Sequence, residues 1–456
     1  MEKVNFKSLQ TSLETDILII GGGSAGCTAA LASSGRGYKV TLVERYGFPG
    51  GTSTQMLDTF YGFFSVGNSP RKIAGGYPDM VVNRLDETGN IFLRPNTYGA
   101  GTGVTYNPER LKLVWDNLLA EKNVQLFYHT MLVSVESTEE RSSCIFYHKG
   151  RGFFRIIARR VIDASGDADY CYHAGLPFEK AGEEGPVQSM TTTFRMANVD
   201  WNAFVKAGGK EMLKRKMADA VDKGTYLLPR REGSIHEMPQ PGCASTVAVK
   251  VTGLDPCDAG QMTAAEMEGR RQAFVYEDFF RDEVPGFRDS RIIGLSHQIG
   301  VRETRRVYGL ERLSLEDCMN TVMPAGRILL CGAPLEDHRE SGAGMPETFW
   351  KYIPGTGIYG VSYGTIVPQN SQIAWVAGRC FSATHDAHSS CRSMAQTMGM
   401  GQAAGLAAVL SLEDDSSAAG IGIKKLQDML VQNGAILDIP DRIADTGRDG
   451  WKNNFL

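Results

Sequence analysis

The chain has 456 residues and a net charge of −4 at pH 7, with 42% hydrophobic and 22% charged residues. These values are ordinary for a soluble globular protein with enough chain for one large domain or two ordinary ones. The slightly acidic balance provides no basic surface of the kind that binds nucleic acid. No apolar run is long enough to span a membrane.

The nine cysteines are odd in number, and no CxxC pair occurs. This spacing supports neither a disulfide framework nor a zinc or iron–sulfur site. We therefore expect reduced, buried thiols in a cytoplasmic protein without a bound metal. The polar residues 1–14 also lack the apolar core of a signal peptide.

The first patterned segment, DILIIGGGSAGCTAALASSGRGYKVTLVE, covers residues 16–44 and reads as strand, glycine turn, helix and strand. Gly21 allows the tight turn, Gly23 lets a pyrophosphate approach the backbone, and Gly26 lets the helix pack closely on the strand. The helix N-terminus then offers N–H donors to phosphates. Together with Glu44 at the end of the second strand, this spacing predicts a dinucleotide site.

Two features separate the candidate dinucleotides. A carboxylate at Glu44 can accept hydrogen bonds from a ribose diol, which argues against the 2′-phosphate of NADP. The following ERYGFPGGTST adds a second glycine pair, Gly50-Gly51, and the hydroxyls of Thr52 and Ser53. A second close backbone approach suits a longer cofactor, so FAD is favoured over NAD.

Beyond this unit the pattern alternates between helical and strand-like segments. We expect helices at 78–89 and 107–122, the second capped by Asn107. Short strands are expected at 124–136, 144–149 and 153–166. The last of these ends in a Gly166-Asp167 turn.

The middle of the chain mixes strands with a charged helix at 263–283, and residues 365–410 return to small, Gly-rich, apolar character. There an apolar strand runs into a turn at Gly378, and a helix is expected to start at Gly399 and Gly401 with its N-terminus towards the cofactor. This layout predicts three parts along the chain: residues 15–185, an insertion at 186–364, and a return at 365–456.

At this point the sequence resembles the FAD-dependent oxidoreductase family, among flavoproteins of the glutathione reductase structural class. The resemblance rests on IIGGGSAGCTAAL, VERYGFPGGTST, VIDASGDAD, IGVRETRRVYG, the long segment from VPQNSQIAWVAGRCFSATHDAHSSCR to GMGQAAG, and more loosely LEDHRESG. It implies an α/β fold: a Rossmann-type FAD-binding domain with a parallel sheet and a three-stranded β-meander, and an inserted mixed α+β substrate domain.

The resemblance also implies extended FAD, with its adenosine at the unit 16–44 and its ring under the middle domain. The implied cofactor-binding residues are Gly21, Gly23, Ser24, Ala25, Gly26, Glu44, Arg45, Gly50, Gly51, Thr52, Ser53, Val133, Gly166, Asp167, Gly378, Arg379, Gly401, Gln402 and Ala403.

Three departures refine this expectation. Relatives often place an acid after the glycine of the last strand, where this chain has Arg379 after Gly378. The GGTST loop has no His for covalent attachment, so we expect noncovalent FAD. A second GxGxxG followed by a strand and an acid is absent, so electrons are expected to pass to O2, a quinone or a partner, or to arrive from a diffusing reductant.

Four residues are candidates for catalysis. Arg302, in SHQIGVRETRR, could clamp a substrate carboxylate or, alternatively, support the domain junction through a salt bridge. His338, in LEDHRESG, could be a general base tuned by a neighbouring acid, or a solvent-exposed loop residue.

His385 and Arg392 lie in SATHDAHSSCR, between the last strand and the helix expected to face the flavin. His385 is a candidate proton shuttle, and its spacing from His388 could suggest a metal, but no third ligand is evident. The aromatic stretch 349–364 is a candidate apolar wall over the flavin.

The favoured function is an FAD-dependent oxidoreductase, a dehydrogenase or oxidase. It would move a hydride between flavin N5 and a small polar substrate, anionic or polyhydroxylated. One alternative is an FAD monooxygenase or halogenase acting on an aromatic substrate, and Trp350 faintly echoes a halogenase signature. Another is a flavin-binding protein without catalytic activity. The sequence leaves the oligomeric state open.

Overall fold

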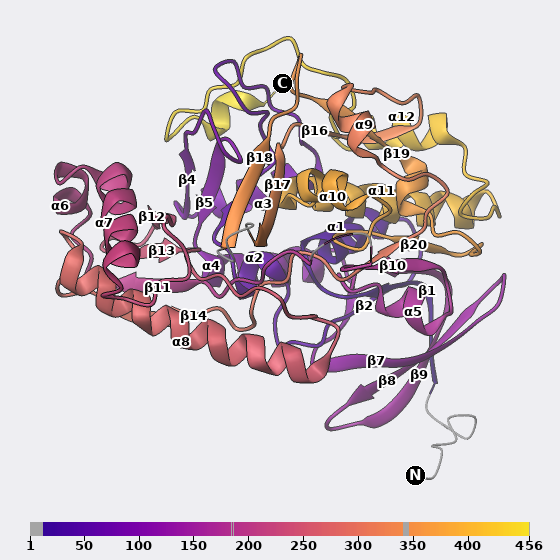
Figure 1. The fold of residues 1–456 in the computed structure, drawn as a ribbon. Helices are drawn as coiled ribbons and strands as arrows, with labels where there is room; N and C mark the ends of the chain where they lie inside the picture. Colours follow the sequence, from indigo (N-terminus) through magenta and orange to yellow (C-terminus); the bar gives the residue numbers. More distant parts are fainter. Residues whose placement is uncertain (1–11, 184, 186, 341–345, 456) are drawn as a thin grey trace.

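The computed structural model describes residues 12–183, 185, 187–340 and 346–455. Its main sheet has the strand order β6-β2-β1-β9-β8-β7, with β20 pairing to β9 as well (Figure 1). The strands are β1 (Ser12–Ile20), β2 (Val40–Val43), β6 (Gln125–Phe127), β7 (Thr130–Ser137), β8 (Ser142–His148), β9 (Gly152–Asp163) and β20 (Ala374–Val376).

This sheet combines a parallel part and a meander because β9 is long enough to serve both. Strands β6, β2, β1, β9 and β20 pair in parallel, as buried apolar runs do when helices cover both faces. The first half of β9 also pairs antiparallel with β8, which pairs antiparallel with β7. The predicted Rossmann-type sheet with a three-stranded meander is confirmed.

Helices α1 (Ser24–Ser33) and α11 (Met394–Glu413) form the buried centre of this unit. A Cβ on Gly401 would lie 2.1 Å from Ala25 O, and one on Gly405 would lie 2.5 Å from Ala29 O. These glycines therefore let two helix backbones pack closely. The expectation that this helix starts at Gly399 and Gly401 was wrong: it starts at Met394, and the glycines lie within it.

Around this centre lie helices and smaller sheets. Asn107 caps α4 as predicted, accepting hydrogen bonds from Glu109 N and Arg110 N. The elements are α2 (Thr52–Gln55), β3 (Thr59–Phe60), α3 (Tyr77–Asp86), β4 (Ile91–Arg94), β5 (Gly103–Tyr106), α4 (Pro108–Glu121), α5 (Asp169–His173), β10 (Phe178–Lys180), β15 (Arg305–Val307), α9 (Leu315–Met319), β16 (Arg327–Cys331), β17 (Leu335–Glu340), β18 (Pro346–Lys351), β19 (Tyr359–Ser362), α10 (His385–Cys391) and α12 (Ile423–Gln432).

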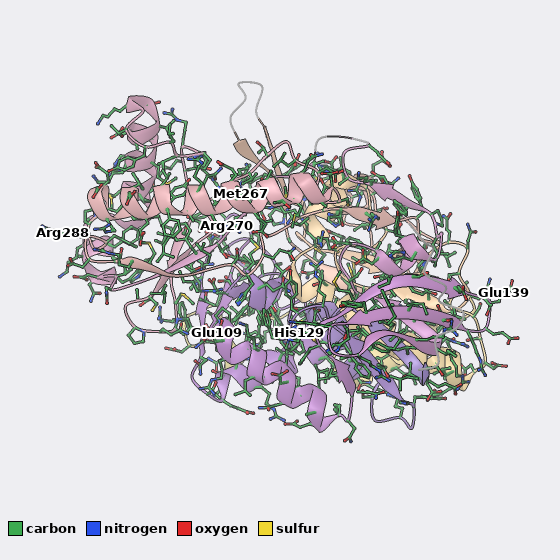
Figure 2. All side chains as sticks on the ribbon, turned by 90° about the horizontal axis from the view of Figure 1, so that it is seen from below. Glu109, His129, Glu139, Met267, Arg270 and Arg288 are labelled. Atoms are coloured by element: carbon green, nitrogen blue, oxygen red, sulfur yellow. The ribbon has the colours of Figure 1, made fainter. Side chains whose placement is uncertain are left out.

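The inserted unit, called the cap below, is an antiparallel sheet covered by helices. Its order is β12-β13-β11-β14. The elements are β11 (Phe194–Ala197), α6 (Trp201–Lys206), α7 (Gly209–Lys223), β12 (Ile235–Glu237), β13 (Ala244–Thr246), α8 (Ala259–Glu283) and β14 (Arg291–Leu295). Figure 2 shows Met267 and Arg270 on α8 and Arg288 beyond it, at the end of the molecule opposite Glu139 of the meander.

Two hydrophobic cores divide the chain. The cap core contains buried residues from Met190 to Ile299. The main core contains residues from Ile17 to Cys171 and again from Val307 to Trp451. By this packing the insertion ends near residue 300 rather than at the predicted 364, because β15 and β16 pack back on the main core. Among the described residues, no helix combines the length and apolarity needed to cross a membrane.

Candidate cofactor and substrate site

The glycine loop lies at the carboxyl end of β1 and leads into α1. Gly21 has φ +100°, and a Cβ on Gly26 would lie 1.9 Å from Gly21 O, so both positions require glycine. Gly23 is the N-cap of α1, which has no side-chain cap and no acid in its first turn. The first turn, with Ser24 and Ala25, is buried. This buried, uncapped helix end is suited to a phosphate.

Glu44 ends β2 beside this loop. Its carboxylate accepts hydrogen bonds from Gly22 N at 2.6 Å and from Tyr46 N at 2.8 Å, and the side chain is buried. Burial raises the pKa of Glu44 above its ordinary value, although these backbone donors oppose the rise. The carboxylate therefore lies next to the phosphate end of α1, where a ribose diol could donate to it.

The second glycine loop packs on the first. Gly50 N donates to Gly22 O at 2.7 Å, and Gly50 and Gly51 both have positive φ. A Cβ on Gly51 would lie 2.7 Å from Gly23 Cα. The Ser24 hydroxyl donates to Ser53 Oγ at 2.9 Å, and Thr52 begins α2. The two predicted glycine loops thus pack against each other and form one continuous surface.

The third predicted group joins the ends of β9 and β20. Gly166 has φ +80°, and Arg379, which follows Gly378, donates to Asp167 Oδ1 at 2.7 Å. Burial favours a higher pKa for Asp167, but Arg379 and Arg45 outweigh it and lower the pKa. Asp167 and Arg379 therefore form an ion pair where the ends of β9 and β20 meet.

Val133 and the predicted cofactor-binding residues of α11 have different structural surroundings. Val133 falls at the irregularity of β7, where the pairing with β8 skips one residue. Gln402 accepts from Tyr77 N at 3.2 Å and donates to Asn433 O, so it joins α11 to two neighbouring helices. Gly401 and Ala403 are buried in helix packing. Cofactor contacts at these four residues, as at the other predicted cofactor-binding residues, remain a prediction.

A cavity of about 310 Å³ lies between the main unit and the cap. Two predicted cofactor residues, Arg45 and Asp167, line it. Arg45 donates to Gln298 Oε1 at 2.8 Å, which links the end of β2 to the cap side of the cavity. The other lining residues are Tyr46, Pro256, Met262, Glu266, His297, Gln298, Val301 and Thr304.

The four predicted catalytic residues come together. Arg302 donates to Ser189 O and to Thr191 Oγ1, the latter at 2.9 Å. Arg392 donates to Gln188 Oε1 at 3.0 Å and to Glu336 O at 2.9 Å. Burial, together with the charge of Arg392, lowers the pKa of Arg302 to about 9. The two guanidinium groups therefore lie in one desolvated region.

His338 lies on β17 beside these arginines and is buried, so the alternative of a solvent-exposed loop residue does not apply. Its Nε2 pairs with Glu336 Oε1 at 2.9 Å, and its Nδ1 with Thr348 Oγ1 at 3.1 Å. Burial and the charge of Arg302 lower the pKa of His338 to about 3. His338 is therefore neutral at neutral pH, with both ring nitrogens engaged.

His385 begins α10 and lies between two carboxylates. Its Nδ1 is 3.1 Å from Glu303 Oε2, and its Nε2 is 3.4 Å from Asp337 Oδ1. Burial favours a lower pKa for His385, but these two acids prevail and raise it to about 9. The ring is an imidazolium at neutral pH. Asp337, His385 and Asp386 each offer one possible metal-ligand atom, and these three atoms lie within 4.8 Å of one another. The sequence did not indicate this grouping.

Lys250 is a further member of this region that the sequence did not indicate. It is buried, and its pKa is lowered to about 7 by burial and then by Arg230 and Arg302. It lies in the cap far along the chain from Arg302, and no local motif marks it. Glu303, next to Arg302, and Asp337, next to His338, could have been found by asking which acids flank the predicted residues.

The remaining predicted features have structural roles. Arg306 is buried and pairs with Glu179 and with Glu303, the latter at 2.7 Å, so it supports the junction. Phe349 and Trp350 are partly exposed, whereas the Tyr359 hydroxyl hydrogen-bonds Ser390 Oγ at 2.7 Å inside the core. The stretch 349–364 therefore does not form one continuous buried wall.

Several buried polar atoms near this region lack a hydrogen-bond partner among the described residues. They are Gln188 Nε2, Ser189 Oγ, Ser296 Oγ and Arg392 Nε. Buried polar groups are normally paired. A cofactor rich in hydrogen-bonding groups would pair them, so the residues present, together with the open end of α1, fit FAD.

Comparison with known proteins agrees with this fit. The model of the family named "FAD dependent oxidoreductase" matches residues 16–430. The mitochondrial glycerol-3-phosphate dehydrogenase of Rattus norvegicus is 47% identical over 55 residues, which are 12% of this chain and 8% of that protein. The probable counterpart in Dictyostelium discoideum is 39% identical over 62 residues, or 13% of this chain and 10% of that protein. The chain thus matches only about a tenth of these relatives.

Solved structures are similar over most of the chain at low identity. A p-nitrophenol 4-monooxygenase from Pseudomonas putida covers 92% of this chain and 84% of its own, with a TM-score of 0.47 and 12% identity. A geranylgeranyl bacteriochlorophyll reductase-like protein from Thermoplasma acidophilum covers 93% and 85%, also with a TM-score of 0.47 and 12% identity.

Proposed function

The chain belongs to the FAD dependent oxidoreductase family and is an enzyme with FAD as its cofactor, and we propose that it oxidises a small anionic molecule. The observation that carries this proposal is the excess of buried positive charge formed by Arg302, Arg392 and Lys250. Burial is the main cause that lowers the pKa of Arg302 to about 9 and that of Lys250 to about 7, and the charge of Arg392 contributes to the first shift and that of Arg302 to the second. A bound anion would relieve that repulsion.

The nearby acids are shared between this group and His385. Asp337 and Glu303 already flank the imidazolium of His385. Glu336 faces the cations, and although burial favours a higher pKa, His338 and Arg392 lower it to about 2. Glu336 acts on Arg302, Arg392 and Lys250, and Asp337 also acts on Arg392 and Lys250. Since an uncompensated buried charge is costly, this favours a ligand with a carboxylate or phosphate group.

The chain's own residues would divide the work as follows. Arg302 and Arg392 hold the anionic group and fix the substrate's orientation, because a guanidinium matches a carboxylate geometrically. The imidazolium of His385 adds positive charge that its two acids hold in place. The cap sheet excludes water from the reacting bond. FAD, when bound, supplies the acceptor for the substrate's hydride.

Noncovalent FAD, a cytoplasmic location, and electron transfer to O2, a quinone or a partner protein remain part of this proposal. They rest on the residues of the GGTST loop, on the thiol content and on the single glycine-loop unit. The alternative of an aromatic monooxygenase or halogenase gains no support from the exposed Trp350.

The test is anaerobic bleaching of the bound FAD by a panel of small molecules. The panel contains glycolate, lactate, malate and sn-glycerol 3-phosphate, the last because the short matching segment belongs to dehydrogenases of that name. Ethylene glycol and glycerol are the uncharged counterparts, and phenol with NADH or NADPH tests the monooxygenase alternative. We expect bleaching by an anionic member. Bleaching by the uncharged members alone, or only by NAD(P)H with phenol, would contradict the proposal.

The arginine assignment has its own control. Arg392→Gln should raise the KM for the bleaching anion while FAD stays bound. Arg271→Gln, which removes an exposed partner of Glu268 on α8, should leave the KM unchanged.

A further inference from the structure

One row of side chains on the cap sheet points at the main unit. The strand register places Arg195 of β11 opposite Ser245 of β13, and Ser245 opposite His236 of β12. The neighbouring row, with Phe194 and Ile235, lies in the cap core instead. Because side chains alternate along a strand, the three polar residues share the face turned away from that core.

This row meets Asp58, which precedes β3 in the main unit. His236 Nε2 lies 2.6 Å from Asp58 Oδ1, and both side chains are buried. Arg195 Nε lies 3.8 Å from Asp58 Oδ2, an ion pair beyond hydrogen-bond distance, and this buried nitrogen has no hydrogen-bond partner among the described residues. The contact between Asp58 and His236 joins residues 178 positions apart, and no local motif predicts it.

The pairing determines which ring nitrogen of His236 is open. A carboxylate only accepts, so the hydrogen in the Asp58 contact is on Nε2, and a neutral ring then has its lone pair on Nδ1. That Nδ1 is buried and has no hydrogen-bond partner among the described residues. A ligand that donates an O–H or N–H would pair it.

The surrounding charges keep the ring neutral. Burial lowers the pKa of His236, and Arg94 and Lys210 lower it further against the opposing effect of Asp58. Burial favours a higher pKa for Asp58, but His236 and Arg195 reverse this and lower it. The charge of Asp58 also acts on the side chains of Tyr61 and Tyr106. At neutral pH the pair is therefore a carboxylate holding a neutral imidazole.

The two histidines predicted from sequence have no comparable open nitrogen. His338 engages Glu336 and Thr348, and His385 is an imidazolium between Glu303 and Asp337. His388 has a free buried Nδ1, but its ring stacks on Phe381 within the main unit and does not face the cap. His236 is the one of these four that combines a neutral ring, an open nitrogen and a place between the two units.

We propose that His236 is the proton acceptor of the oxidation and that Asp58 is its positioning residue. The inference rests on the proposed function, since it concerns the same reaction. The substrate's C–OH group loses its hydroxyl proton to His236 Nδ1, and its carbon loses a hydride to FAD, which is reduced by two electrons as C=O forms. An acid that orients a neutral imidazole is the arrangement that general bases use. The substrate class is thereby a hydroxyl-bearing anion.

The first experiment needs no substrate. Long-range proton–nitrogen correlation spectra of the FAD-bound protein with 15N-labelled histidine report the tautomer of each ring, and loss of a signal in His236→Gln identifies His236. We expect a neutral ring at pH 7 that is protonated at Nε2. An imidazolium, or a proton on Nδ1, would overturn the proposal, because neither form can accept a proton at Nδ1.

The second experiment tests whether His236 acts as a general base or only stabilises the contact between the two units. In His236→Gln the amide nitrogen can still donate to Asp58, but the lone pair at the Nδ1 position is gone. General-base loss should slow anaerobic bleaching by the active hydroxy-acid member of the panel by about a hundredfold or more. The matched control is Thr193→Val, which removes another buried contact between the units, the 2.6 Å bond to Met56 O.

The outcomes are distinct. Slow bleaching in His236→Gln, with FAD content and unfolding midpoint like those of Thr193→Val, supports the base. The wild-type bleaching rate should also fall as the pH drops and His236 is protonated, and this acidic limb should disappear in the variant. A normal rate, or loss of FAD from His236→Gln but not from Thr193→Val, would overturn the assignment. If no panel member bleaches the wild type, the proposed function fails, while the tautomer measurement still decides the state of His236.

Discussion

The glycine-loop unit and the polar junction between the main unit and the cap are built in opposite ways. In the first, the paired groups are close in sequence: Glu44 and Gly22 are separated by 22 positions and lie on one strand–helix–strand unit. In the second, Glu303 meets His385 across 82 positions, and Asp58 meets His236 across 178. A local unit can be recognised from its spacing, whereas the junction exists only once two cores have packed together.

The largest effect on FAD binding and stability is expected at Gly21, where the local backbone geometry accepts only glycine. Gly21→Ala places a Cβ 2.4 Å from Ala164 O at φ +100°. The loop must shift, so we expect the protein to lose FAD and much of its stability. Visible absorbance and thermal unfolding would measure this. Gly326→Ala is the control, since its nearest neighbouring atom lies 3.8 Å away, an ordinary contact. Unchanged FAD content in Gly21→Ala would contradict the tight turn.

At the junction, two arginines of one motif should behave differently. Arg302→Gln should lower kcat/KM for the anionic substrate by about thirtyfold to a few thousandfold, because losing one partner of a buried charged contact costs about 2–5 kcal/mol. FAD should stay bound.

Arg306→Gln should instead lower the unfolding midpoint, because it leaves Glu179 and Glu303 without their buried partner. Steady-state kinetics and calorimetry on both variants test this division. If Arg302→Gln lowered the unfolding midpoint but left kcat/KM unchanged, Arg302 would only stabilise the junction.

A smaller effect is expected at the end of β2. Glu44→Ala removes a carboxylate that can accept from the ribose, so FAD affinity should fall by about tenfold to a hundredfold, the equivalent of one charged hydrogen bond. Dialysis followed by absorbance measures retention. Glu109→Ala, an exposed acid at the start of α4, serves as the control. Equal retention in the two variants would count against an adenosine site at Glu44.

The last effect appears only at alkaline pH. The pKa of His385 is raised to about 9 from an ordinary 6.5, so its contribution to stability is fully present below pH 6.5 and is lost as the pH rises through 9. The change amounts to about 3 kcal/mol at most. Denaturant unfolding at several pH values should show a decline in this window that His385→Asn lacks. An identical decline in the variant would remove His385 as its source.

Prediction from sequence succeeded where a residue's partner is nearby or where its type forces the backbone. Asn107 had to cap a helix that starts at Pro108, and the glycines of the first loop had to turn the chain after β1. The start of α11 was wrong because Gly401 serves helix packing against Ala25, which a sequence pattern does not distinguish from a helix N-terminus.

The amino-acid sequence alone indicated the dinucleotide-binding unit and named Arg302, His338, His385 and Arg392 as candidates, while the family resemblance of its motifs implied the meander. Its periodicity and glycine spacing are read within a few turns of chain, where backbone sterics decide the outcome. Only the tertiary structure decided the protonation of these residues and the meeting of Asp58 with His236. Burial and charge in a site shared by two units depend on every neighbour brought there by folding, and those neighbours come from distant parts of the chain.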